Sequence, residues 1–221
     1  MDVICESKER TSMATHSGTI AGRQTPVASN LGNHPVLNTP VEGPWDEPYE
    51  VIYVGMGCFW GAERIMWNLP GVIATAVGYM GGTTLNPTYE EVCTGQTGHA
   101  EIVRVVYDPR KISGEQILKT FWENHDPTTL NRQGNDQGTQ YRSAIYYTNE
   151  NQREAALATR NAFQSVLNEH GKGQITTEIV SAKEAGTFYL AERYHQAYLH
   201  HIPNGYCNHG PNGMTCPIGI V

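Results

Sequence analysis

The spacing of hydrophobic and polar positions changes several times between residues 49 and 202. Short runs of Val, Ile, Ala and Tyr predict strands, whereas apolar residues that recur every three or four positions predict helices. The expected strands cover residues 49–55, 71–79, 100–108, 143–148 and 176–182. The expected helices cover 58–69, a short turn at 87–93, 114–125, 150–171 and 187–200.

The main elements from residue 49 to residue 148 follow the order strand, helix, strand, strand, helix, strand. This order is typical of the split βαβ unit, in which a sheet carries its helices on one face. We therefore predict an α+β fold, a ferredoxin-like two-layer α/β sandwich with a βαββαβ core, extra helices and long coil termini.

The two ends of the chain differ in composition from its middle. Residues 1–44 are rich in Ser, Thr, Asn, Gly and Pro without an apolar period, which predicts a flexible N-terminal arm. A catalytic α+β domain is expected over 45–202, and a glycine-rich tail over 203–221. The polar connection at 125–142, "HDPTTLNRQGNDQGTQYR", is long enough to be either functional or a solvated insertion.

Composition restricts the partners of the protein. The 221 residues are 39% apolar and carry a formal net charge of −7, and their basic residues form no cluster, which argues against binding to nucleic acid. No apolar run approaches the roughly 18 residues that span a bilayer. The beginning of the chain lacks the apolar middle of a secretion signal, so we expect a soluble cytoplasmic protein without a membrane partner.

Five cysteines, at 5, 58, 93, 207 and 216, are too few and too scattered for the disulfide framework of a small secreted domain. In a reducing compartment they are thiols, either buried and inert or reactive. Cys93 ends a short apolar turn and is expected to be buried and structural.

Cys58 lies in the stretch "GMGCFWGAE", between a predicted strand and a predicted helix. A helix N-terminus favours an anion and lowers the pKa of a thiol, which predicts a nucleophilic thiolate. A small buried hydrophobe is the alternative, and position alone leaves both open. Trp60 points away from the apolar stripe of its helix and Phe59 lies at the edge of that stripe, so an indole beside the thiol could hold a methyl group.

Glu101 stands in the apolar strand "AEIVRVVYD", on the same face as Val103 and Val105. Burial raises the pKa of a carboxyl group, as a general acid near neutral pH requires. The alternative is an ion pair with His99 or an arginine. Tyr89, Asp136 and Tyr141 could join the same pocket if the turn and the polar loop fold over it.

Taken together, these segments resemble the peptide methionine sulfoxide reductase A family. The motif "GCFWG" is identical to the family signature, and "NPTYEEVCTGQTGHAE", "FWENHDP" and "QGNDQGTQYRSAIY" match further family segments in the same order. The resemblance extends from about Gly22 to the C-terminus.

The resemblance implies a role for each matching residue. Cys58 would attack the sulfoxide sulfur, and Glu101 would protonate or hydrogen-bond the departing oxygen. Tyr89 and Tyr141 would hold the sulfoxide oxygen, and Asp136 would help to orient the substrate. Phe59 and Trp60 would surround the S-methyl group. The family reduces the S epimer of methionine sulfoxide, free or in proteins, and no cofactor or metal is implied.

The tail "GYCNHGPNGMTCP" supplies two more thiols. A sulfenic acid condenses with a second thiol, and the family implies that Cys207 attacks the oxidised Cys58 before Cys216 attacks Cys207. Thioredoxin would reduce the resulting disulfide, and a monomer is the family expectation. A static disulfide or a zinc pair with His209 is the alternative, although the spacing suits no common zinc site.

Two other functions remain open at this point. A thiol peroxidase would also form a sulfenic acid on Cys58 but would not need Trp60, and a thiol-rich metal-binding module would need no catalysis. His195 could approach the site from the predicted last helix, but a histidine on a helix face is more often a surface or capping residue, so it is not assigned to the site.

Overall fold

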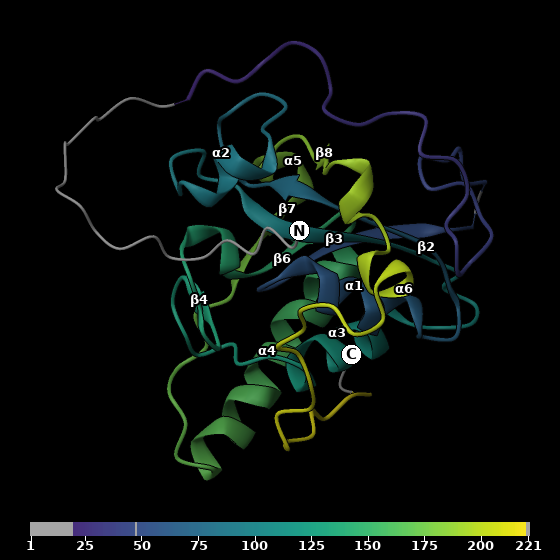
Figure 1. The fold of residues 1–221 in the computed structure, drawn as a ribbon. Helices are drawn as coiled ribbons and strands as arrows, with labels where there is room; N and C mark the ends of the chain where they lie inside the picture. Colours follow the sequence, from purple (N-terminus) through teal and green to yellow (C-terminus); the bar gives the residue numbers. More distant parts are fainter. Residues whose placement is uncertain (1–19, 47, 220–221) are drawn as a thin grey trace, which may run out of the picture.

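The computed structural model describes residues 20–46 and 48–219 of the chain, and its centre is a mixed α/β fold around a mostly antiparallel sheet (Figure 1). The strands of this sheet are β1 (Glu50–Met56), β2 (Val72–Met80), β3 (Ala100–Tyr107), β6 (Ser143–Tyr147), β7 (Glu178–Ser181) and β8 (Tyr189–Leu190). Their spatial order is β7-β6-β1-β3-β2-β8, and among these neighbours β6 and β7 run parallel whereas the others are antiparallel. A separate hairpin joins β4 (Arg132–Gln133) to β5 (Asp136–Gln137) inside the polar loop.

Side-chain caps explain where several helices begin. The helices are α1 (Phe59–Trp67), α2 (Tyr89–Cys93), α3 (Gly114–Glu123), α4 (Glu150–Glu169), α5 (Ala182–Ala185) and α6 (Tyr198–His201), with 3₁₀ turns η1 (Thr139–Tyr141) and η2 (Arg193–His195). Thr88 and Ser113 form capping boxes at α2 and α3, and Asn149 caps α4. Each cap satisfies backbone N–H groups that the first helical turn leaves without partners.

Alternation along the strands divides the core between the two faces of the sheet. Val103 and Val105 of β3 pack in the large core with residues of α1, α3 and α4, whereas Ile102 packs on the opposite face with Tyr146 and Phe188. This arrangement confirms the predicted split of β3 and places Glu101 on the face that α1 covers.

The predicted helix over residues 187–200 is wrong. The structure has β8, η2 and α6 in this segment, and Ala197 adopts a left-handed backbone conformation with φ of 48°. The side-chain amide of Gln196 accepts a hydrogen bond from the Val77 N–H (3.0 Å) and donates one to the Val77 carbonyl (2.9 Å). Gln196 therefore replaces a strand partner along β2, and this tertiary contact overrides the local helical pattern.

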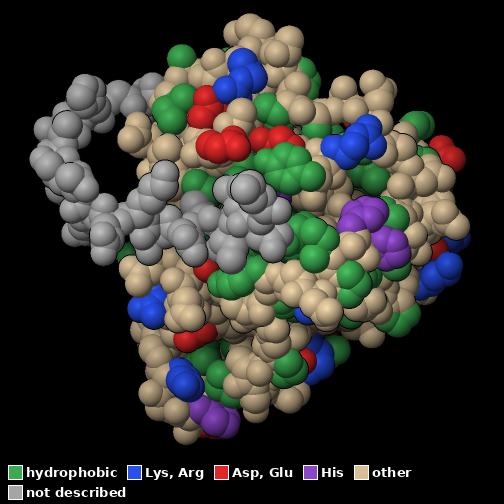
Figure 2. Space-filling view, in the orientation of Figure 1, with side chains coloured by type: hydrophobic (Ala, Val, Ile, Leu, Met, Phe, Trp, Pro, Cys, Tyr) green, Lys and Arg blue, Asp and Glu red, His purple; other side chains and the backbone are tan. Residues whose placement is uncertain are grey.

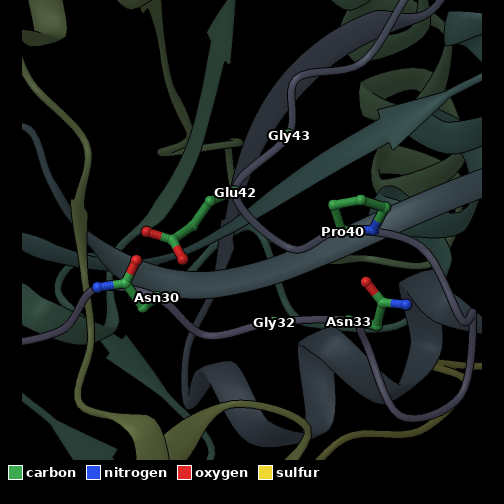
Figure 3. Close-up of a pocket in the computed structure, with 6 residues that line it drawn as sticks. All are labelled: Asn30, Gly32, Asn33, Pro40, Glu42 and Gly43. Carbon is green, nitrogen blue, oxygen red and sulfur yellow. The ribbon is translucent and has the colours of Figure 1, made fainter.

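Residues 20–44 contact the sheet at several points. The Arg104 guanidinium donates to the Val41 carbonyl (2.6 Å), and Gly22 forms a β-bridge with Leu85. The turn at 30–43 encloses a pocket lined by Asn30, Gly32, Asn33, Pro40, Glu42 and Gly43 (Figure 3). The predicted division into arm, domain and tail stays a prediction, and residues 1–19 lie outside the described part of the chain.

Within residues 20–46 and 48–219, no helix is long and apolar enough to cross a membrane. On the face in Figure 2, Lys and Arg side chains are scattered among acidic and apolar ones.

Candidate active site

Cys58 occupies the N-cap position of α1, immediately after β1, as the sequence predicts. Gly57 before it has φ of 95°, and a Cβ atom there would lie 2.5 Å from the Cβ of Gln133 in the polar loop. Only glycine permits this backbone at this closeness to the loop. As a result the loop packs against the start of α1, and the Cys58 thiol is buried with 5% of its surface exposed.

The prediction that Cys58 is a thiolate is wrong for the structure at rest. Burial raises the pKa of the Cys58 thiol well above its usual value, and the nearby carboxyl of Glu101 raises it further. The backbone N–H groups of Trp60 and Gly61 favour the thiolate, but they do not offset the loss of solvation. Cys58 is therefore a thiol at neutral pH, with donors already placed for the anion.

Glu101 lies at the start of β3 and is 1% exposed. Its Oε2 accepts a hydrogen bond of 2.9 Å from the backbone N–H of Phe59, the residue after Cys58. Burial raises the pKa of Glu101 to about 8, which confirms the predicted direction. The alternative pairing with His99 is absent, because the His99 ring contacts the Thr84 carbonyl and the Gly82 N–H.

Phe59 and Trp60 extend from the first turn of α1, and both are buried. The indole N–H of Trp60 donates to Nδ1 of His195 (3.0 Å), and the indole stacks on Tyr198 with ring centroids 4.0 Å apart. Both aromatic rings thus belong to the same buried cluster as Cys58, and contacts with His195 and Tyr198 orient the indole.

Tyr89, Tyr141 and Asp136 gather at the same place. The pKa of the Tyr141 phenol is raised by burial first, and then by its ionisable neighbours Glu101, Tyr89, Asp136 and Cys58. The structure therefore brings α2, η1 and the β4–β5 hairpin together around the thiol. Asp136 itself accepts hydrogen bonds from the Tyr206 hydroxyl (2.8 Å) and from the Asn208 amide (2.7 Å), so it faces the C-terminal tail.

The tail runs from α6 past α1 toward α3 and α4 (Figure 1). It places Cys207 beside the first turns of α1, where the Arg64 guanidinium contacts the Cys207 sulfur at 3.1 Å. Cys216 is fully buried, with its sulfur 3.8 Å from the Thr159 carbonyl of α4. Because their contacts lie on different elements, the two thiols do not form a disulfide in this conformation, and both are free.

His209 does not act as a metal partner of these thiols in the structure. Its Nε2 donates to the Met56 carbonyl at 2.8 Å. Within the described residues, no group of three or more His, Cys, Asp or Glu side chains is arranged to hold a metal ion.

Comparison with known proteins gives the same assignment over most of the chain. The sequence profile of the family described as "Peptide methionine sulfoxide reductase" matches residues 50–215. The chain belongs to the peptide methionine sulfoxide reductase family. It is accordingly an oxidoreductase that acts on methionine sulfoxide.

Individual relatives cover nearly the whole length. The chain is 60% identical over 199 residues to "Peptide methionine sulfoxide reductase MsrA" of Salinispora arenicola, with 89% of each chain covered. It is 58% identical over 197 residues to the mitochondrial peptide methionine sulfoxide reductase of Homo sapiens, covering 89% of this chain and 81% of the relative. The solved structure of methionine sulfoxide reductase A of Corynebacterium diphtheriae superposes with a TM-score of 0.79 at 46% identity, covering 90% of this chain and 95% of that one.

Sequence reasoning missed His195 as part of this reductase site. It is buried against Phe59, Trp60 and Tyr89, whose ring centroids lie 5.2, 5.6 and 4.5 Å from its own. Burial lowers the pKa of His195 to about 3, so the ring is neutral and Nδ1 can accept the indole hydrogen. The sequence pattern of residues 187–200 predicts one continuous helix, so it gives no indication that His195 lies in the site.

Tyr206 and Cys93 differ in smaller ways from expectation. Tyr206 joins the site through Asp136, a contact that no local pattern in the tail predicts. Cys93 is half-buried at the end of α2 rather than fully buried.

Proposed function

We propose that the protein reduces methionine S-sulfoxide, free or in proteins, to methionine, with Cys58 as nucleophile and Glu101 as acid. The observation that carries this proposal is the buried Glu101 carboxyl, which accepts a 2.9 Å hydrogen bond from the N–H of Phe59, the residue after Cys58. Burial there raises the pKa of Glu101 to about 8, which favours the protonated acid near neutral pH. A sulfoxide oxygen leaves poorly unless it is protonated, so a neutral acid beside a sulfur nucleophile suits this substrate.

The reducing step moves one oxygen atom from the substrate to the enzyme. The Cys58 sulfur attacks the sulfoxide sulfur while Glu101 delivers its proton to the oxygen. The oxygen then forms a bond to the Cys58 sulfur while the substrate sulfur–oxygen bond and the new sulfur–sulfur bond break, so methionine leaves and Cys58 becomes a sulfenic acid. The thiol proton of Cys58 replaces the proton that Glu101 gave up, so substrate sulfur is reduced, Cys58 is oxidised and no proton is gained or lost.

The remaining site residues bind the substrate in this proposal. Phe59 and Trp60 hold the S-methyl group, since both rings belong to the same buried cluster as Cys58 and Trp60 is oriented by His195. Tyr89 and Tyr141 donate to the sulfoxide oxygen. Asp136 orients the substrate backbone from the hairpin, after exchanging at least part of its contact with Tyr206 or Asn208.

The return to the thiol state uses the tail. Cys207 attacks the Cys58 sulfenic acid, Cys216 then attacks Cys207, and thioredoxin reduces the Cys207–Cys216 disulfide. Support comes from the free thiols of Cys207 at α1 and Cys216 between α3 and α4. No cofactor is assigned.

Several broader assignments belong to the same proposal. The β6-β1-β3-β2 order with α1 and α3 on one face is consistent with a ferredoxin-like two-layer core. We assign 45–202 as the catalytic domain, 203–221 as the redox tail and 1–44 as an N-terminal arm. We further assign a cytoplasmic location and a monomeric state.

A coupled assay tests the proposal. Reduced thioredoxin, its reductase and the pyridine nucleotide should be consumed with methionine S-sulfoxide as substrate. The R epimer and hydrogen peroxide should give little turnover, and the Cys58→Ser variant should give none. Turnover that is faster with peroxide than with the S-sulfoxide would favour the thiol peroxidase instead.

A further inference from the structure

The surroundings of Cys207 contain two groups that the reduction of the sulfoxide does not use. Arg64 Nη2 lies 3.1 Å from the Cys207 sulfur. His209, two residues beyond Cys207, is more than half covered and directs its ring toward the same place on α1.

Gly61 makes this arrangement possible. A Cβ atom at Gly61 would lie 2.9 Å from the Cys207 sulfur and 2.4 Å from Nδ1 of His209. The sulfur and the imidazole nitrogen therefore both lie against Gly61, and in this conformation the Cys207 thiol is directed to the His209 carbonyl (3.9 Å). Gly61 lies three residues after Cys58 and three before Arg64, so it neighbours both on α1.

The tautomer of His209 follows from its other contact. Its Nε2 lies 2.8 Å from the Met56 carbonyl, which can only accept, so Nε2 carries the hydrogen. Burial lowers the pKa of His209 and the Arg64 charge lowers it further, so the ring is neutral. Its Nδ1 thus bears a lone pair, is buried, and has no hydrogen-bond partner among the described residues.

We propose that Arg64 and His209 activate Cys207 for its attack on the oxidised Cys58, with Arg64 holding the thiolate and Nδ1 of His209 accepting the thiol proton. This inference rests on the proposed function and adds catalytic residues for its second step. Positive charge and an unprotonated base beside a thiol are the features that make a cysteine nucleophilic.

The step balances without an outside oxidant. The Cys207 sulfur forms a bond to the Cys58 sulfur as the Cys58 sulfur–oxygen bond breaks. The hydroxide leaves as water with a proton from Glu101, and His209 passes the Cys207 proton to solvent, from which Glu101 is reprotonated, so no proton is gained or lost overall. Cys207 is oxidised and the sulfenyl sulfur of Cys58 is reduced.

Other ionisable groups also face this region, and they set its pH dependence together. They are Arg64 and Cys58 of α1, Glu101 of β3, His125 after α3, Asp136 and Tyr141 of the polar loop, and Tyr206 and His209 of the tail. Arg64 is the one in this set whose charge directly touches the Cys207 sulfur.

The test follows one turnover without reductant in a Cys216→Ser reference protein, which stops the relay at the Cys58–Cys207 disulfide. Methionine is measured by chromatography after acid quenching, and the disulfide by mass spectrometry after alkylation of the remaining thiols. Arg64→Gln should release methionine at the reference rate at neutral pH yet form the disulfide slower by on the order of tenfold. Arg64→Lys should keep most of the disulfide rate.

The pH dependence of disulfide formation distinguishes activation of the Cys207 thiol by Arg64 from mere positioning of the tail by Arg64. At about pH 9.5 hydroxide in bulk water can remove a thiol proton without a neighbouring base, so Arg64→Gln should approach the reference rate. His209→Gln, which can still donate to the Met56 carbonyl, should show the same neutral-pH loss and alkaline recovery. Arg153→Gln on the exposed face of α4 is the matched control and should change neither step.

Two results would overturn the inference. One is disulfide formation at the reference rate by Arg64→Gln at neutral pH, and the other is an equal deficit at both pH values, which would mean that Arg64 only positions the tail. Failure of the reference protein to release any methionine would overturn the proposed function and this step with it.

Discussion

At the residue scale, Cys58 and Glu101 illustrate a competition between local and tertiary effects. The N-cap position and its N–H groups favour a thiolate, but removal of the thiol from water has the larger effect and raises the pKa of Cys58. Burial acts in the same direction on Glu101. The resting site therefore contains two protonated groups, and the anion at sulfur develops only as the substrate reacts.

The pKa of Glu101 predicts how the rate of methionine formation should depend on pH above neutrality. Below about pH 8 Glu101 is protonated and can donate to the oxygen, so the single-turnover rate of methionine release should fall as the pH rises through about 8. Stopped-time chromatography of methionine across pH 6 to about 10 measures this. A rate that instead rises through this range, following ionisation of a thiol alone, would contradict the role of Glu101.

Two substitutions of Glu101 distinguish hydrogen-bond donation to the sulfoxide oxygen from the packing of this side chain. Glu101→Gln should retain much of the first-turnover rate and lose the alkaline limb near pH 8, because an amide still donates a hydrogen bond. Glu101→Ala should be slower by about 10²-fold or more, measured in the same assay. Equal rates in the two variants would argue against a donor at this position.

The sequence singles out these two residues as candidates, because each departs from a simple rule. A cysteine between glycines at a strand–helix junction and a carboxylate in an apolar strand are local anomalies that a reader of the sequence can find. The direction of the Cys58 pKa could not be predicted, because it depends on how fully the polar loop and Gln133 cover the thiol.

At the element scale, the segment from β8 to α6 holds the indole of α1. His195 of η2 accepts the indole N–H, and Tyr198 of α6 stacks on the ring. The left-handed Ala197 between them lets both side chains reach Trp60 from a single turn of chain. A period of three to four residues predicted a continuous helix here, since the pairing of Gln196 with β2 involves residues far apart in sequence.

Removal of the His195 ring should loosen the indole. For His195→Ala we expect the first-turnover rate at subsaturating methionine sulfoxide to fall on the order of tenfold, because the methyl pocket loses its orientation. His200→Ala, on the exposed side of α6, is the matched control and should be neutral. Unchanged turnover, together with unchanged Trp fluorescence, would show that the indole needs no such support.

Cys216 must leave its buried place to reach Cys207. The Cys216 N–H donates to Glu123 of α3 at 2.8 Å, and the Lys119 ammonium contacts the Cys216 carbonyl at 3.1 Å. Burial raises the pKa of Cys216 to about 12, so the thiol is unreactive where it lies. Movement of the tail away from α3 is therefore part of the proposed relay.

Alkylation measures this movement. In the reduced protein at neutral pH, iodoacetamide should modify Cys207 at least about tenfold faster than Cys216. When iodoacetamide is present during a single turnover, Cys216 should become reactive before the Cys207–Cys216 disulfide forms. A Cys216 that is neither alkylated nor oxidised during the turnover would be excluded from the relay, as would one whose replacement in Cys216→Ser leaves full steady-state activity with thioredoxin.

At the scale of the whole molecule, a buried carboxylate ties three parts of the chain to α1. Glu63 accepts hydrogen bonds from the Thr75 hydroxyl (3.1 Å) and from the Ala197 N–H (2.8 Å), and His34 Nε2 lies 3.8 Å away. The network joins the N-terminal segment, β2 and the turn before α6 at the helix that carries Cys58.

Loss of this network should destabilise the fold as a unit. Glu63→Ala leaves the Ala197 N–H buried without this acceptor and leaves the Thr75 hydroxyl with His34 Nε2 (2.9 Å) alone, and it should lower the free energy of unfolding by about 3 kcal/mol. Urea denaturation followed by circular dichroism measures the change, and Glu169→Ala on the exposed end of α4 is the control, expected within about 0.5 kcal/mol. A loss for Glu63→Ala no larger than that of the control would mean that the network contributes little.

The order of strands and helices from β1 to α4 was predictable from periodicity, because these elements follow one another along the chain with clear caps. The hairpin inside the polar loop, the contacts of residues 20–44 and the course of the tail were not, since they depend on pairings between distant segments. Asp136 with Tyr206 is one such pairing, and Arg64 with Cys207 is another.

The role of Cys58 is tested by measuring the methionine released from methionine S-sulfoxide in a single turnover without reductant and by identifying the oxidised cysteines with mass spectrometry. We expect methionine in amounts comparable to the enzyme, oxidation that begins on Cys58 and ends as a Cys207–Cys216 disulfide, and no methionine from Cys58→Ser. Methionine formation by Cys58→Ser, or oxidation of the tail cysteines while Cys58 stays a thiol throughout, would contradict this role.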